Sequence, residues 1–158
     1  MISDDQLSGL LGGWTGEERL SATAWTAAGT AQGTLSISAG PGGGLLIDYA
    51  EDRDGARMAG HGVLAGDGWW WFDSYGFIPA TPGTAAWRDG ELVLERRSDR
   101  GRTVTVLRIV GGYLEQRIDT AVPADAPLVP LLRASYARPS DGAPAPCAGR
   151  AAMSQRRP

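Results

Sequence analysis

Turn signals recur along the chain about every 8–12 residues, and this spacing constrains the fold more than any other feature. The signals are short segments rich in glycine, proline and aspartate: Ala28-Gly29, 40–44, 52–55, 66–68, Asp89-Gly90, 99–101, Gly111-Gly112 and 123–127. Glycine supplies positive φ angles, proline presets φ, and aspartate hydrogen-bonds its own backbone, so such segments form tight turns. The apolar runs between them are short, and the sequence therefore predicts an all-β chain.

About ten strands fit between these turns. We expect them near residues 13–26, 31–39, 45–51, 56–65, 69–76, 84–88, 91–98, 102–110, 113–121 and 131–138. Residues 3–6 form a capping box before a leucine-rich segment, which predicts one short N-terminal helix. Sequential strands joined by tight turns favour an antiparallel up-and-down barrel, because closure removes exposed strand edges. A two-sheet sandwich is the alternative, and it normally needs longer connections.

The sequence divides into one domain, 1–138, and a tail, 139–158. The first segment is long enough to bury a core of its own. Proline, alanine, glycine, serine and arginine dominate the second, so we expect a flexible tail. The single cysteine, Cys147, falls in that tail. One cysteine and one histidine argue against an internal disulfide, a cysteine-based zinc cluster and a two-histidine metal site.

Charge and hydropathy exclude several classes of partner. The formal net charge is −3, and all 15 basic residues are arginine. This composition gives no overall attraction to nucleic acid or an anionic membrane. No apolar run approaches a membrane span, and the acidic start of the chain is unlike a signal peptide. We expect a cytoplasmic protein that binds a small molecule without a cofactor, and that is a monomer or a homodimer.

Two-residue turns at Asp89-Gly90 and Gly111-Gly112 predict which side chains share a face. The predicted pairs are Arg88–Glu91, Trp87–Leu92 and Ala85–Leu94 in the first hairpin, and Ile109–Leu114, Leu107–Gln116 and Thr105–Ile118 in the second. If Arg100-Gly101 is the turn between them, Arg96 lies opposite Thr105. The resulting inner wall is Trp87, Leu92, Leu94, Arg96, Thr105, Leu107, Ile109, Leu114, Gln116 and Ile118.

Arg96 is the one cation placed against this apolar wall. Burying an unpaired guanidinium costs several kcal/mol. Two interpretations follow. In the first, Arg96 meets an inward carboxylate or extends to the barrel rim. In the second, it holds an anionic group of a ligand, with Thr105 and Gln116 nearby.

The aromatic hairpin at 56–76 contains the only histidine. A three-residue loop at 66–68 places His61 opposite Asp73, whereas a two-residue turn at Asp67-Gly68 places it opposite Ser74. A carboxylate partner would raise the imidazole pKa and suit a general base, and a purely structural hydrogen bond is the alternative. Which face points inward stays open. One face carries Met58, Leu64, Trp70 and Phe72, and the other carries His61, Trp71, Asp73 and Tyr75.

Three segments resemble known barrels. Residues 10–17 (LLGGWTGE) resemble the Gly-x-Trp opening of the first strand in lipocalin-like (calycin) barrels, where the Trp closes one end. Residues 71–74 are similar to small bacterial lipocalin-like domains of unknown function, and 127–134 to the last strand of nitrobindin haem barrels. The resemblance implies a ligand-enclosing barrel with Trp14 as its plug. The haem-ligating histidine of nitrobindins corresponds to Leu131, so haem binding does not carry over.

These features predict the binding of a small hydrophobic or aromatic molecule, with an anionic or carbonyl end, in the barrel cavity. The expected ligand-binding residues are Trp14, Trp71, Tyr75, Trp87, Arg96, Thr105 and Gln116. The alternative is a cofactor-free cyclase, isomerase or hydrolase of a natural product. In that enzyme His61 is the general base, Asp73 orients it, and Arg96 stabilises an oxyanion. A haem-based sensor is a third interpretation, which lacks the family's iron ligand.

Overall fold

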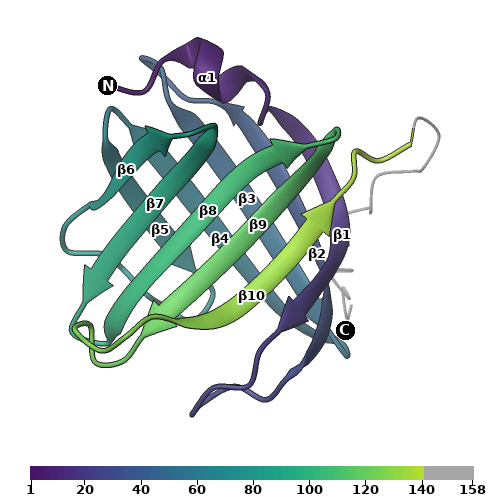
Figure 1. Cartoon of the computed structure of the whole chain (residues 1–158), viewed down its shortest axis with the longest axis vertical. Helices are drawn as coiled ribbons and strands as arrows, with labels where there is room; N and C mark the ends of the chain where they lie inside the picture. Colours follow the sequence, from purple (N-terminus) through teal and green to yellow (C-terminus); the bar gives the residue numbers. More distant parts are fainter. Residues whose placement is uncertain (141–158) are drawn as a thin grey trace, which may run out of the picture.

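The computed structural model describes residues 1–140, which form a closed antiparallel barrel with one short helix at one end (Figure 1). The elements are α1 (Asp4–Ser8), β1 (Gly12–Leu20), β2 (Gly29–Ala39), β3 (Leu45–Arg53), β4 (Ala56–Ala65), β5 (Gly68–Asp73), β6 (Gly83–Arg88), β7 (Glu91–Ser98), β8 (Gly101–Val110), β9 (Tyr113–Ala121) and β10 (Val129–Tyr136). Neighbouring strands follow the chain order, and β1 pairs with β10 to close the barrel. The predicted fold class is confirmed. Cys147 and the predicted tail, apart from Pro139 and Ser140, lie outside the described residues.

The helix covers the end of the barrel at which β1 begins (Figure 1). Its capping box is present: the Ser3 amide donates to Gln6 Oε1 at 2.9 Å, and the Gln6 amide donates to Ser3 Oγ at 3.4 Å. Trp14 is buried below the helix and donates its indole N–H to the Leu10 carbonyl at 2.9 Å. The guanidinium of Arg138 lies 4.1 Å from the centre of the Trp14 ring. These contacts close this end.

The opposite end is ringed by the turns that follow β1, β3, β5, β7 and β9, and we call it the mouth. β1 stops at Leu20, earlier than predicted, because the side chain of Thr23 holds a turn after it. Its hydroxyl oxygen accepts hydrogen bonds from the amides of Trp25 at 3.4 Å and Thr26 at 3.0 Å. Among the described residues, no helix has both the length and the hydropathy needed to cross a bilayer.

The registers predicted from the turns at Asp89-Gly90 and Gly111-Gly112 are confirmed. The register between β7 and β8 differs from the prediction, because Ser98 pairs with Gly101 and the turn lies at Asp99-Arg100. Gly101 belongs to the strand, where its missing side chain lets the Ala121 carbonyl approach closely. Arg96 therefore lies opposite Thr103 rather than Thr105. The shift is two residues, so Arg96 stays on the inner face.

Both predicted registers of the aromatic hairpin are wrong. Ala65 pairs with Gly68, so the turn is Gly66-Asp67, with Gly66 at a φ of 62°. His61 then lies opposite Phe72 rather than Asp73 or Ser74. A one-residue change of register moves one strand's side chains to the other face relative to its neighbour. Neither of the two predicted sets of side chains therefore shares one face of the hairpin.

The inner face of this hairpin combines members of both predicted sets. Met58 and Leu64 from β4 lie on the same side as Trp71 and Asp73 from β5. The glycines between them make this packing fit, because a Cβ atom at Gly60 would enter the Trp71 ring. The three consecutive tryptophans alternate accordingly, with Trp69 and Trp71 inside and Trp70 on the outer face.

The interior is apolar near α1 and becomes polar toward the mouth. The buried core contains Leu7, Leu10, Trp14, Leu35, Ile37, Leu45, Ile47, Leu64, Trp69, Leu92, Leu94, Leu107 and Leu114. The inward positions nearer the mouth carry Glu18 of β1, Glu51 and Arg53 of β3, Asp73 of β5 and Arg96 of β7. The titratable side chains of the interior therefore gather on the side away from the helix.

Candidate ligand site at the barrel mouth

A pocket of about 360 Å³ lies beside the mouth, where β5 and β6 separate. These strands pair only through Gly68–Thr84 and Trp69–Gly83. Beyond Trp69 the segment 74–82 bridges the gap, and it contains two prolines, which cannot donate to a strand ladder. The pocket is lined by Trp69, Trp71 and Phe77, by residues 78–81 and Gly83, and by residues 96–99 of β7 and its turn.

Arg96 is the half-buried cation of this pocket. Its guanidinium carbon lies 5.9 Å from the centre of the Trp71 ring and 5.2 Å from that of Phe77. Burial lowers the pKa of Arg96, and the negative charge of Asp73 opposes this shift. No carboxylate among residues 1–140 lies within ion-pair distance of it. The guanidinium therefore rests between two aromatic rings, with N–H donors left for a ligand.

Trp71 connects the pocket to the barrel interior. Its indole N–H donates to Asp73 Oδ2 at 3.2 Å, which holds the ring in place. Its ring centre lies 6.1 Å from that of Trp69 and 6.2 Å from that of Tyr49, both in tilted arrangements. The Trp71 ring is therefore the one side chain that separates Tyr49 from the pocket.

Behind Trp71 a buried carboxylate, Glu18, is held by two tyrosine hydroxyls. The Tyr49 hydroxyl lies 2.9 Å from Oε1 and 2.8 Å from Oε2 of Glu18, and the Tyr136 hydroxyl lies 2.6 Å from Oε1. Tyr49 also contacts Glu51 Oε2 at 3.0 Å, and Tyr136 contacts Gln116 Oε1 at 2.7 Å. Burial raises the pKa of Glu18 to about 7, against the two hydroxyls, and the Glu51 charge adds to the increase.

Sequence reasoning missed Glu18, Glu51 and Tyr49, and it did not include Tyr136 among the expected site residues. The available signal was strand alternation, because residues 14, 16 and 18 of one strand share a face. If Trp14 points into the barrel, Glu18 does too. Gly33 on the neighbouring strand gives it room, because a Cβ atom there would overlap the Glu18 carboxyl group.

The structure brings two of the predicted ligand-binding residues together in the pocket, Trp71 and Arg96. Gln116 is buried and belongs to the Glu18 cluster, and Thr105 faces inward opposite Leu94. Trp14 and Trp87 pack against the apolar core, outside the pocket.

Tyr75 lies outside the pocket, contrary to the expectation. Its side chain is 76% exposed. β5 ends at Asp73, whose Oδ1 accepts a hydrogen bond from the Tyr75 amide at 3.1 Å. This turn breaks the strand alternation on which the inward assignment depended.

The predicted pairing of His61 with Asp73 is wrong. His61 is exposed on the outer face, and its Nδ1 lies 2.6 Å from Oδ1 of Asp48 on β3. Asp73 faces the interior beside Trp71. The two side chains therefore lie on opposite faces of the sheet, so Asp73 cannot orient His61.

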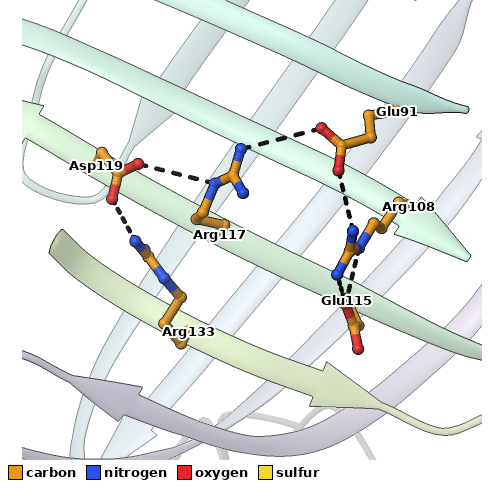
Figure 2. Close-up of polar contacts among 6 residues, drawn as sticks. All are labelled: Glu91, Arg108, Glu115, Arg117, Asp119 and Arg133. Atoms are coloured by element: carbon orange, nitrogen blue, oxygen red, sulfur yellow. Dashed lines mark hydrogen bonds and ion pairs between the residues drawn. The ribbon is translucent and has the colours of Figure 1, made fainter. Parts of the chain in front are cut away.

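A larger hollow, of about 570 Å³, lies on the outer surface across β1 and β7 to β10. Figure 2 shows a chain of ion pairs there that links Glu91, Arg108, Glu115, Arg117, Asp119 and Arg133, at distances from 2.6 to 3.9 Å. Three arginines and three acids neutralise one another. A ligand would have to displace these contacts, and this hollow is the weaker candidate.

Solved structures with a similar fold exist. No protein-family model matches the sequence, and no curated protein matches it. The barrel is similar to the crystal structure of Rv2717c from M. tuberculosis, with a TM-score of 0.62, 15% identity, and coverage of 88% of this chain and 99% of that one. It is also similar to a protein of unknown function from the DUF3598 family of Nostoc punctiforme, with a TM-score of 0.57 and 13% identity, covering 87% of this chain and 49% of that one. These likenesses show the fold alone.

Proposed function

We propose that the protein binds a small hydrophobic or aromatic molecule with an anionic or carbonyl end in the mouth pocket. The observation that carries this proposal is the position of Arg96 between Trp71 and Phe77, with no ion-pair partner in the described chain. Aromatic walls with one convergent polar group are typical of small-molecule sites, and about 360 Å³ lies within their size range.

The architecture supports the same proposal. A short helix, an opening strand with an inward Trp14, and a closed meander are features of lipocalin-like (calycin) barrels, and we propose that type for this one. Barrels of this type hold one small ligand. The enzyme hypothesis built on His61 has no support of this kind, since His61 points away from the interior.

The test uses two fluorescent probes of similar shape, the anionic anilinonaphthalene sulfonate and the uncharged N-phenylnaphthylamine. We expect saturable binding of both. Arg96→Met keeps a long apolar side chain but removes the charge, so it weakens sulfonate binding about tenfold and leaves the neutral probe unchanged. Arg88→Met, at an exposed position on β6, is the matched control and changes neither. Equal effects of Arg96→Met on the two probes, or no saturable binding, would overturn the proposal.

A further inference from the structure

Five side chains meet behind Trp71, and oxygen–oxygen contacts join them in four residue pairs. The Tyr49 hydroxyl contacts Glu18 and Glu51, and the Tyr136 hydroxyl contacts Glu18 and Gln116. Each of these contacts is between 2.6 and 3.0 Å. Two oxygens at such distances need a proton between them, because their lone pairs otherwise repel.

The protons available can be counted. Each tyrosine hydroxyl supplies one proton. If the Gln116 amide is flipped, so that its NH₂ group faces Tyr136, it supplies a third proton. Burial raises the pKa of Tyr49 and of Tyr136, so both hydroxyls keep their protons. The fourth residue pair lacks a proton while Glu18 and Glu51 are both ionised, because a carboxylate only accepts hydrogen bonds. One carboxyl proton completes the network.

We propose that Glu18 and Glu51 hold one proton between them at neutral pH, and that an anionic ligand binds in the mouth pocket together with this proton. The first half stands on the contacts alone, and the second rests on the proposed function. The bridging Tyr49 hydroxyl contacts both carboxyl groups, so a proton on either one completes the same network.

One basic side chain, Arg53 of β3, shares the inner face with Tyr49 and Glu51, and it forms no ion pair with Glu18 or Glu51. The other side chains around Glu18 are Tyr49 and Glu51 of β3, Tyr136 of β10, Gln116 of β9 and Ala31 of β2, and Gly33 of β2 leaves space for its carboxyl group. No arginine in the described chain forms an ion pair with Glu18, and the flanking Glu17 and Arg19 are exposed and pair with each other. The raised pKa of Glu18 agrees with this arrangement.

The coupling to the pocket runs through Trp71, which contacts Tyr49 on one side and Arg96 on the other. Loss of the shared proton adds a negative charge behind this ring. Because the interior screens charges poorly, that charge repels an anion in the pocket and attracts the Arg96 guanidinium that should hold it. Affinity for an anion should therefore fall as the pH rises and this proton is lost, and by linkage anion binding holds the proton more tightly.

The experiment measures the dissociation constant of anilinonaphthalene sulfonate from about pH 5 to about pH 9, a range in which the sulfonate stays charged and the pair titrates. We expect the constant to rise about three- to tenfold in one step near neutral pH. Glu18→Gln is a neutral isostere, so it removes the step and keeps the tight affinity of low pH. Tyr49→Phe, which breaks the bridge, shifts the step. Glu17 is an exposed neighbour on β1, so Glu17→Gln should keep the pH-dependent step. Binding of the neutral probe should show no such step.

The proton itself is measured without ligand, by carbon-13 NMR of glutamate carboxyl groups in the intact protein. One resonance should titrate near neutral pH and disappear in Glu18→Gln. The absence of such a resonance would overturn the shared proton. A titrating resonance with a pH-independent dissociation constant would overturn the coupling alone. If neither probe binds, the proposed function fails with the coupling, while the NMR titration still decides the shared proton.

Discussion

Glu18 makes the stability of the barrel depend on pH in an unusual direction. Most carboxylates that are paired in the folded state stabilise it as the pH rises. Burial instead raises the pKa of Glu18 from 4.5 to about 7, so the folded state binds more protons than the unfolded chain between these values. Its contribution is fully present below about pH 4.5 and is lost as the pH rises through about 7.

We expect the loss to be about 3 kcal/mol of unfolding free energy between these limits. Urea unfolding of the wild type and of Glu18→Gln at matched pH values measures it, since the difference between the two isolates this group. The wild type should lose stability relative to the variant as the pH rises. A constant difference would contradict the raised pKa.

Gly60 is a second residue that the pocket constrains, because the position has no space for a side chain. A Cβ atom there would enter the Trp71 ring, so Gly60→Ala must displace the indole that lines the pocket. We expect it to cost about 1–3 kcal/mol of stability and to weaken both probes. Gly29→Ala is the matched strand control, because a Cβ atom at Gly29 meets nothing within 4 Å. Thermal unfolding and probe titration of both variants check this, and equal behaviour would show that Trp71 does not depend on the glycine.

Single residues were predictable from the sequence where strand alternation was anchored by a known face. Arg96 and Gln116 share a face with leucines on their strands, and both are inward. Glu18 was equally accessible to this reasoning, but its charge favoured an exposed position. Its burial follows from the hydroxyls of Tyr49 and Tyr136, which lie far from it in the sequence and are visible only once the barrel is closed.

At the scale of elements, the segment between β5 and β6 determines the pocket. Phe77 stands over Arg96 from this segment, which takes little part in the sheet. Phe77→Ala should therefore weaken both probes about three- to tenfold, the cost of losing one aromatic wall, and leave the unfolding temperature nearly unchanged. Phe72→Ala on the outer face of β5 is the matched control, with unchanged binding. Titration and calorimetry of the two variants separate a pocket wall from a structural loop.

Hairpins differed in how well the sequence specified their register. Asp89-Gly90 and Gly111-Gly112 each allow one tight turn, and their pairs are confirmed. The segment 66–68 has two glycines around an aspartate, so three turns fit it and only the backbone decides among them. The tryptophans after it could not correct the error, because three in a row supply an aromatic side chain to either face.

At the scale of the whole molecule, barrel closure joins the two ends of the described chain into one site. β10 pairs with both β1 and β9, and it brings Tyr136 to Glu18. Turn spacing predicted the meander, and the resemblance of residues 10–17 predicted the end that Trp14 closes. The composition of the interior could not be predicted, because it depends on which distant strands face one another across the barrel.

The domain predicted over residues 1–138 is tested with two shortened chains. A chain that ends at Ser140 keeps all the strands of the described residues, so we expect the unfolding temperature and probe affinities of the full chain. A chain that ends at Pro127 lacks β10, which exposes the edges of β1 and β9 and removes a hydroxyl partner of Glu18. Open edges of this kind pair with other chains, so it should aggregate and lose probe binding. Circular dichroism and light scattering distinguish the outcomes. A folded, monomeric shorter chain would show that the barrel does not need closure, and that Glu18 tolerates burial without Tyr136.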